Sequence, residues 1–257
     1  MTDIASGHPA IDRYLTERYA RVRGMSSRFA AAICGYVIRR QTELGAVGDI
    51  VEIGTFEGRF FIAMALGLAP GEHAVGIDLF DWPNEGVLNR LLAHCDDAGL
   101  PRENFTAWKQ QSRDITSEAL RSKLATGHVR FFHIDGEHEH ASLSSDLELA
   151  HAVMHPSGVI CLDDMLHPGY PTLITAVLDY LARHPEMCVM CIVDREDIVA
   201  AAKFLICRKD AVALYEQDLM ERFVRFHFIV GADVMGHFTL VLTPQPRDVD
   251  VGWDEAR

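Results

Sequence analysis

The stretch GDIVEIGTFEGRF, residues 48–60, decides the fold. Its first half is a short, nearly continuous apolar run that ends in glycine, which is typical of a buried strand in a parallel sheet. The second glycine, Gly58, opens a segment whose apolar spacing predicts a helix over 59–68. The sequence therefore predicts a strand, a tight turn and a helix, which together form the first unit of an α/β fold.

Further strands and helices alternate along the chain. The patterns predict strands at 48–54, 73–80, 105–110, 128–135, 157–164, 186–194 and 202–208, and further helices at 85–98, 116–124, 140–154 and 172–184. Such alternation predicts a doubly wound, mostly parallel sheet, here of seven strands.

Two segments flank this sheet. Residues 1–45 are predicted to be an N-terminal helical segment that breaks near Gly24, with Ser26 or Ser27 as the cap of its second helix. Residues 46–210 are predicted to form the main domain. Residues 211–257 are interpreted as a C-terminal extension packed on the same domain, with a helix at 211–223 and either a hairpin or an added edge from RFHFIV and HFTLVL.

Composition excludes several classes of function. The formal net charge is −13, which argues against tight non-specific binding of nucleic acid. No segment has the roughly 20 apolar residues that span a bilayer, and the N-terminus lacks an apolar signal core. The six cysteines stand among apolar neighbours, as reduced core thiols do. We expect a cytoplasmic protein whose partner is a small molecule. We expect it to bind neither membranes nor nucleic acid, and it could form a homo-oligomer.

The turn after the first strand has the spacing E-x-G-x-x-x-G, not the G-x-G-x-x-G of dinucleotide folds. Phe56 stands where the middle glycine would admit a pyrophosphate, so a ligand without phosphates fits better. Asp78 ends the next strand, where a carboxylate can accept hydrogen bonds from a ribose diol. A plain strand-to-helix turn is the alternative reading, and the pairing with Asp78 favours the ligand.

Acidic residues end two further strands. Asp135 ends the strand before Gly136 and His138, and Asp163 and Asp164 end the strand 157–164. Because parallel strands end at one edge of the sheet, these three carboxylates are predicted to converge and repel one another. A hard divalent cation such as Mg²⁺, Ca²⁺ or Mn²⁺ would relieve that repulsion. His138 is predicted to accept a proton from a substrate hydroxyl. Helix capping by Asp163 and a loop contact by Asp164 are the alternatives.

The other candidate ligands are interpreted as structural. No H-x-x-x-H pair sits in a context that suits zinc, and the C-x-x-C pair of Cys188 and Cys191 falls inside an apolar strand. No arrangement of two histidines and one carboxylate suits iron. The remaining histidines considered are interpreted as packing or surface residues: His133, His140, His151, His155 and His167.

The segments VEIGTFEGRF, GIDLF, HIDGEHEHASLSSDLELA and GVICLDDM, in this order, resemble class I S-adenosylmethionine-dependent methyltransferases. They are most similar to the metal-dependent small-molecule O-methyltransferases, the group that includes macrolide-sugar O-methyltransferases and proteins labelled cephalosporin hydroxylase. The resemblance covers roughly residues 24–208 and implies a Rossmann-like domain.

The resemblance also implies roles for single residues. The cofactor S-adenosylmethionine would be bound by Glu52, Gly54, Thr55, Gly58, Asp78, Gln111, Ser112 and Asp135. Mg²⁺ would be held by Asp135, Asp163 and Asp164, and His138 would be the general base. The implied activity is Mg²⁺-dependent methyl transfer to a hydroxyl of a vicinal diol, such as a sugar or a catechol, in natural-product biosynthesis. A non-catalytic S-adenosylmethionine-binding protein and a hydroxylase-like relative remain alternatives.

Overall fold

The computed structural model describes residues 4–228 and 230–246. Its α-helices are α1 (Pro9–Glu17), α2 (Arg28–Glu43), α3 (Arg59–Ala65), α4 (Val87–Ala98), α5 (Ser117–Arg121), α6 (His140–Val153), α7 (Leu173–Arg183) and α8 (Glu216–Arg222). Its strands are β1 (Asp49–Ile53), β2 (Ala74–Asp78), β3 (Phe105–Lys109), β4 (Val129–Ile134), β5 (Met154–Met165), β6 (Met187–Val193), β7 (Ala202–Arg208), β8 (Ala232–Val234) and β9 (His237–Leu242). Short 3₁₀ helices lie at Tyr19–Arg21, Arg102–Asn104, Ser112–Asp114, Lys209–Leu214 and Val224–Phe226.

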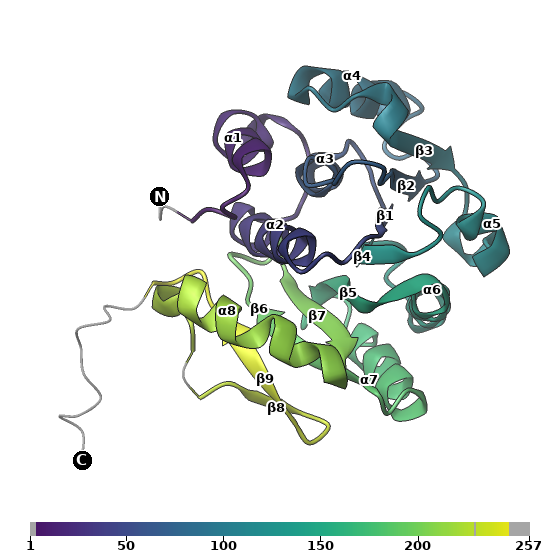
Figure 1. The fold of residues 1–257 in the computed structure, drawn as a ribbon. Coiled ribbons are helices and arrows are strands. Elements are labelled where there is room, and N and C mark those ends of the chain that lie inside the picture. Colours follow the sequence, from purple (N-terminus) through teal and green to yellow (C-terminus); the bar gives the residue numbers. More distant parts are fainter. Residues whose placement is uncertain (1–3, 229, 247–257) are drawn as a thin grey trace, which may run out of the picture.

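A single sheet with the strand order β3-β2-β1-β4-β5-β7-β6-β9-β8 forms the centre of the molecule (Figure 1). Strands β3, β2, β1, β4 and β5 are parallel neighbours, whereas β7 runs antiparallel to both β5 and β6. The order reverses at β1, so the carboxyl ends of β1 and β4 flank the crevice in which open α/β sheets bind ligands.

Helices cover both faces of this sheet, as the alternating pattern predicts. One core packs α1, α2, α3, α4 and α8 against the sheet, and the other packs α5, α6 and α7 against its opposite face. The central strand β1 is buried at every position, because both its faces meet a layer of helices. The doubly wound α/β fold is therefore confirmed.

The predicted number of seven strands is wrong: the sheet has nine strands and is mixed. The two additional strands come from the C-terminal extension, where β9 pairs in parallel with β6 and β8 forms a hairpin with β9. Strand β6 is buried throughout, and an unpaired edge on so apolar a strand would expose its backbone groups to unwanted pairing. Strand β9 covers that edge.

Two adjacent serines, Ser26 and Ser27, fix the N-terminal segment beside the sheet. Ser27 caps α2, since its hydroxyl accepts a hydrogen bond from the amide of Ala30 at 2.9 Å. Ser26 instead donates to a carboxylate oxygen of Asp163 at 3.0 Å. The loop before α2 is thus fixed against the end of β5. No helix within the described ranges is long and apolar enough to cross a membrane.

Candidate active site

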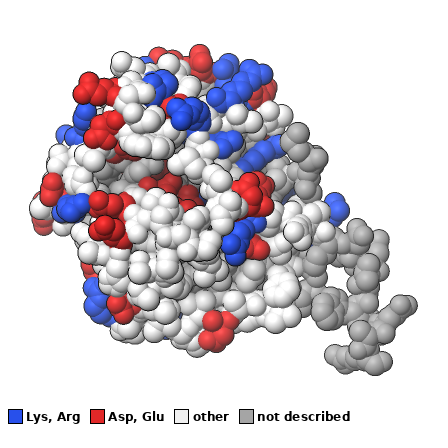
Figure 2. Space-filling model, turned by 180° about the vertical axis from the view of Figure 1, so that it is seen from behind, with Lys and Arg blue, Asp and Glu red and all other residues white. Residues whose placement is uncertain are grey.

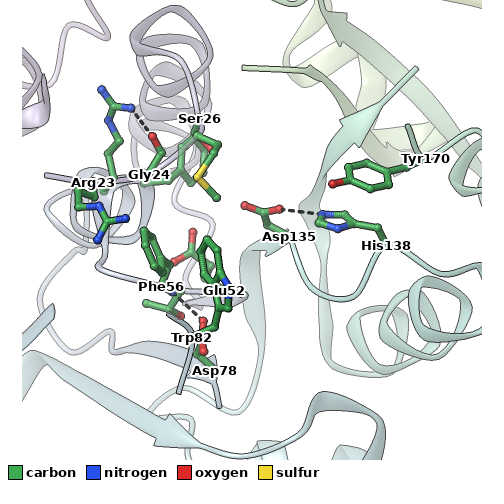
Figure 3. A pocket seen from close by; sticks show the side chains of 15 residues that line it. Arg23, Gly24, Ser26, Glu52, Phe56, Asp78, Trp82, Asp135, His138 and Tyr170 are labelled. Carbon is green, nitrogen blue, oxygen red and sulfur yellow. Dashed lines mark hydrogen bonds and ion pairs between the residues drawn. The ribbon is translucent and has the colours of Figure 1, made fainter. Parts of the chain in front are cut away.

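Two adjoining cavities of about 380 and 260 Å³ lie at the carboxyl ends of the central strands. They share Gly54, Asp78, Trp82 and Asp135, so we treat them as one cleft. Figure 3 shows side chains that line the larger cavity. The larger cavity extends toward His138 and Tyr170, and the smaller one extends toward Gln111 and Ser112. Of the residues predicted to bind a cofactor, all but Gly58 line this cleft.

The turn after β1 brings the backbone close to β4. Gly54 has a positive φ of 85°, and a Cβ there would lie 1.8 Å from the carbonyl oxygen of Asp135. Gly58 has a φ of 87°, and its Cβ would lie 2.3 Å from a methyl group of Leu91. Any side chain at either position would push the turn away from its neighbours. Gly58 therefore shapes the turn by packing against α4.

Asp78 anchors the loops on both sides of the cleft. One of its carboxylate oxygens accepts a hydrogen bond from the amide of Phe56 and the other accepts one from the amide of Phe80, both at 2.7 Å. Each carboxylate oxygen can accept a second hydrogen bond, and Asp78 lines both cavities. Asp78 can therefore hold the two loops and still accept hydrogen bonds from a ligand.

Glu52 presents an unpaired carboxylate oxygen beneath the cleft. Its Oε1 lies 2.8 Å from Nδ1 of His133, while its buried Oε2 has no hydrogen-bond partner among the described residues. The same holds for the buried hydroxyl of Thr55. Burial raises the pKa of Glu52. A buried polar atom without a partner is costly, so these two groups suit a polar ligand that enters the cleft.

Three side chains form what we call the cleft group: Asp135, His138 and Asp164. The Nε2 atom of His138 lies 2.6 Å from Oδ2 of Asp164 and 3.9 Å from Oδ1 of Asp135 (Figure 3 shows the second pair). Tyr170 stacks on the imidazole, with 4.1 Å between the ring centroids. The ligand atoms of the group lie within 4.8 Å of one another, as a metal ion requires.

The carboxylates of the cleft group perturb the imidazole between them. Asp135 and Asp164 raise the pKa of His138 to about 10, so the free protein holds an imidazolium between two carboxylates. Burial and the charge of Asp163 raise the pKa of Asp135 to about 7. Nε2 of His138 is buried, and its approach to Asp164 lacks hydrogen-bond geometry. That nitrogen is therefore directed at the carboxylates without being satisfied by them.

The predicted ligand Asp163 lies outside the cleft group. Its Oδ2 forms an ion pair with Lys203 of β7 and accepts the hydrogen bond from Ser26, and its Oδ1 accepts one from the amide of Asp164. Although burial opposes its ionisation, Lys203 and His133 hold the pKa of Asp163 well below its usual range. Both oxygens of Asp163 are thus engaged by other groups, whereas Asp135 and Asp164 lie together with His138.

Lys203 is the residue that sequence reasoning missed. Its ammonium is fully buried, lies 3.0 Å from the hydroxyl of Ser26, and sits over the ring of Phe60 at 4.8 Å. Despite burial, Asp163 raises the pKa of Lys203. The sequence feature that could have identified Lys203 is its inward position in the apolar run AKFLICR, residues 202–208. The repulsion expected among three aspartates is relieved in part by this side chain.

The sequence analysis also did not identify Tyr170, which stacks on His138, or Asp146. Asp146 of α6 is buried, and neither of its carboxylate oxygens has a hydrogen-bond partner within residues 4–228 and 230–246. It lies behind the smaller cavity, since a Cβ on Gly136 would come within 3.2 Å of its Oδ2. Burial raises the pKa of Asp146 to about 6. An aspartate on the inward face of a predicted helix was the sequence signal.

Comparison with known proteins agrees with this geometry. Residues 51–165 match the family model of a methyltransferase domain. That segment is similar to methyltransferase domains. Its class I, S-adenosylmethionine-dependent family, predicted from the motifs, is confirmed. The domain contains the turn after β1, Asp78 and the whole cleft group. No curated protein sequence matches the chain.

Solved structures share the fold of the methyltransferase domain at low sequence identity. The O-methyltransferase NovP is 14% identical with a TM-score of 0.58, over 71% of this chain and 80% of that one. TomG from Streptomyces achromogenes, an O-methyltransferase solved with S-adenosylmethionine, is 16% identical with a TM-score of 0.55, over 77% and 89%. CalS11, a TDP-rhamnose 3′-O-methyltransferase, is 17% identical with a TM-score of 0.54, over 77% and 86%.

On the face drawn in Figure 2, acidic and basic side chains alternate around a hollow, and acidic groups lie inside it. Long-range attraction of nucleic acid would need the opposite sign of charge gathered on one face.

Proposed function

We propose that the protein is a divalent-cation-dependent O-methyltransferase that transfers the methyl group of S-adenosylmethionine to a hydroxyl of a small molecule. One observation carries the proposal: Asp135 and His138 line the same cleft as Gly54 and Asp78. The residues predicted to bind the cofactor and those able to deprotonate a substrate therefore face one volume. Methyl transfer needs this proximity, because the oxygen must approach the sulfonium methyl group in line.

The residues of the cleft fit S-adenosylmethionine. The unpaired Oε2 of Glu52 and hydroxyl of Thr55 would bind the polar end of the methionine part. Asp78 would accept hydrogen bonds from the ribose hydroxyls, as it still has free acceptor positions. Gln111 and Ser112 line the smaller cavity, which would hold the adenine.

The cleft group fits a divalent cation. Asp135 and Asp164 would bind it through their carboxylates, the ligands that Mg²⁺ and Mn²⁺ prefer. When bound, such an ion lowers the pKa of a coordinated hydroxyl and fixes its orientation. A cation held by Asp135 and Asp164 would offset the charges that raise the pKa of His138, so its Nε2 would be free to accept the released proton. Tyr170 keeps the imidazole in place by stacking.

A vicinal diol is the substrate shape that this arrangement favours, because two adjacent hydroxyls can chelate one cation. Trp82 and Phe56 lie 5.5 Å apart at the cleft and offer aromatic faces to a sugar or a catechol ring. The sugar substrate named for CalS11 supports this class and a role in natural-product biosynthesis. We still expect the protein to act in the cytoplasm on a small molecule, and it could form a homo-oligomer.

The test is methyl transfer from labelled S-adenosylmethionine to a panel of catechols and nucleotide sugars, with Mg²⁺ and with EDTA. We expect transfer to at least one diol, abolished by EDTA and by Asp164→Asn, while cofactor binding measured by calorimetry persists. The matched control is Asp179→Asn, an exposed carboxylate outside the cleft. Cofactor binding without turnover of any diol would favour a non-catalytic binding protein, and turnover unaffected by EDTA would remove the cation from the proposal.

A further inference from the structure

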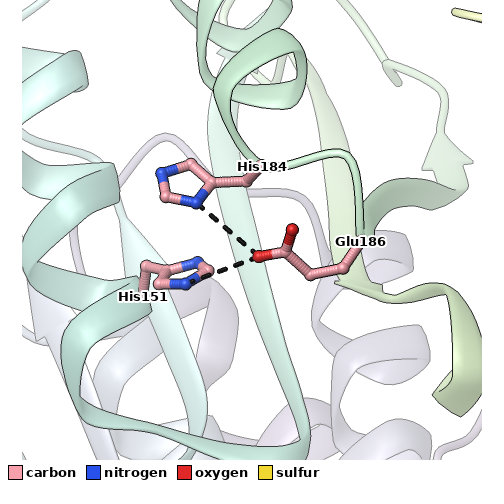
Figure 4. Close-up of side chains that lie close together, drawn as sticks. All are labelled: His151, His184 and Glu186. Carbon is pink, nitrogen blue, oxygen red and sulfur yellow. Dashed lines mark ion pairs between the residues drawn. The ribbon is translucent and has the colours of Figure 1, made fainter.

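A second cluster of metal-ligating side chains lies outside the cleft. His151 lies in the last turn of α6, His184 directly follows α7, and Glu186 directly precedes β6. We call these three residues the α6–α7 group (Figure 4). Their ligand atoms lie within 4.8 Å of one another. They belong to none of the interactions described for the cleft.

The two imidazoles converge on one carboxylate oxygen. Oε1 of Glu186 lies 3.7 Å from Nε2 of His151 and 3.6 Å from Nδ1 of His184 (Figure 4). These separations are too long for hydrogen bonds. They are close to the roughly 3.3–3.5 Å that separates two ligand atoms on a tetrahedral zinc ion with bonds of about 2.1 Å. The three groups are therefore spaced as ligands around an ion.

The outer nitrogen of each imidazole already has an orienting partner. Nδ1 of His151 lies 2.8 Å from the hydroxyl of Tyr180, and Nε2 of His184 lies 3.1 Å from both carboxylate oxygens of Glu148. Metal-bound histidines characteristically use their second nitrogen in this way, which fixes the tautomer and the ring orientation. Here both outer nitrogens are occupied and both inner nitrogens face Glu186.

The surroundings also favour a cation. His151 and His184 stand at the carboxyl ends of α6 and α7, where the helix dipoles attract positive charge. The three side chains are 20–39% exposed, so an ion can enter. With two imidazoles and one carboxylate, the donor set suits zinc-type ions rather than Mg²⁺.

We propose that the α6–α7 group binds Zn²⁺ or a similar transition-metal ion, with His151 Nε2, His184 Nδ1 and Glu186 as ligands and water in the fourth position. The ion ties the ends of α6 and α7 to the start of β6. This site is independent of the proposed activity, since it shares no residue with the cleft group.

The test is titration of the untagged, full-length protein with Zn²⁺ by calorimetry, in excess Mg²⁺ to occupy the cleft group. Co²⁺ serves as a second probe, because its absorption bands report tetrahedral coordination. We expect one zinc ion per chain. Glu186→Gln and His184→Asn should each weaken its binding about 100-fold, and Glu148→Gln about 10-fold through the loss of an orienting partner.

The control variants are His155→Asn, a nearby histidine outside the group, and Asp164→Asn in the cleft group. Both should keep the zinc site. Glu186 is half-exposed, so its variant folds even if a histidine variant does not. Absence of zinc binding to the wild-type protein, affinity unchanged by Glu186→Gln, or binding lost in Asp164→Asn would each overturn the proposal.

Discussion

The cleft group and the α6–α7 group each combine histidine with carboxylates, yet their surroundings differ. In the cleft, one imidazole lies between two carboxylates and its Nε2 faces both of them. In the α6–α7 group, two imidazoles face one carboxylate, and Tyr180 and Glu148 occupy their outer nitrogens. The first arrangement suits a hard cation and proton transfer, and the second suits a softer ion. The orientation of the nitrogens therefore says more about chemistry than the residue types do.

The two groups also differ in what lies beneath them. Behind the cleft group, Asp163, Lys203, His133 and Glu52 form a buried network of charges. The three side chains of the α6–α7 group are themselves partly exposed. Buried ion pairs lose much when one partner is removed, whereas exposed pairs contribute little. The same kind of substitution should therefore have very different effects in the two regions.

The largest expected effect concerns catalysis and separates the two groups directly. His138→Gln should lower kcat for methyl transfer about 10²- to 10⁴-fold, because it removes the group that accepts the proton. S-adenosylmethionine affinity should stay unchanged, since other residues bind the cofactor. His184→Gln, the matched change in the α6–α7 group, should leave kcat as it is. Equal activities of the two variants in steady-state assays would contradict the assignment of His138.

The next effect concerns stability. Lys203→Met should lower the free energy of unfolding by about 3–5 kcal/mol, because the variant leaves the buried carboxylate of Asp163 without its cation. Urea denaturation monitored by circular dichroism measures this loss. The double variant Lys203→Met, Asp163→Leu should recover most of it, since no buried charge is then left unpaired. A loss below about 1 kcal/mol for the single variant would show that His133 alone compensates Asp163.

Lys203 also illustrates what the sequence can and cannot predict. Apolar runs ending in glycine or aspartate predicted β1, β2, β4 and β5, and hence which residues lie at the carboxyl edge of the sheet. The partner of Asp163 depends on the antiparallel pairing of β5 with β7, whose register places Leu162 opposite Phe204. Sequence patterns do not give the register of strands so far apart along the chain, so the buried lysine could not be assigned to its aspartate.

The histidines outside the cleft gave a similar result. His151 is interpreted from the sequence as a packing or surface residue, although it stands in H-x-x-x-H spacing with His155. Its neighbours His184 and Glu186 come from the junction between α7 and β6, and only the packing of α6 beside α7 brings the three together. Spacing rules detect ligands within one element, whereas ligands contributed by several elements require the tertiary structure.

Asp146 provides a third test, through pH. Its pKa is raised to about 6, so the folded protein keeps this proton at pH values where the unfolded chain has lost it. Stability should therefore fall as the pH rises from about 4 to about 6. Asp146→Asn should stabilise the protein at pH 7 by about 1–3 kcal/mol, and the gain should vanish below about pH 4.

Thermal or urea unfolding at pH 4 and pH 7 measures this difference. Asp179→Asn is the control, because that carboxylate is 65% exposed and lies outside the region behind the cleft. A gain of the same size at both pH values would indicate altered packing instead of a buried charge. The expected result would mean that the region behind the cleft holds an unpaired carboxylate at a cost in stability, which the α6–α7 region does not.

The smallest expected effect belongs to the α6–α7 group without metal. Glu186→Gln should change the free energy of unfolding by no more than about 0.5 kcal/mol in EDTA, because its contacts with His151 and His184 are long and partly exposed. With Zn²⁺ the wild-type protein should gain stability according to RT ln(1 + [Zn²⁺]/Kd), and the variant should gain far less. If the two proteins unfold at the same temperature in both buffers, the carboxylate is a surface group. A difference that appears only with Zn²⁺ separates a ligand from an ion-pair partner, because an ion pair would act in EDTA as well.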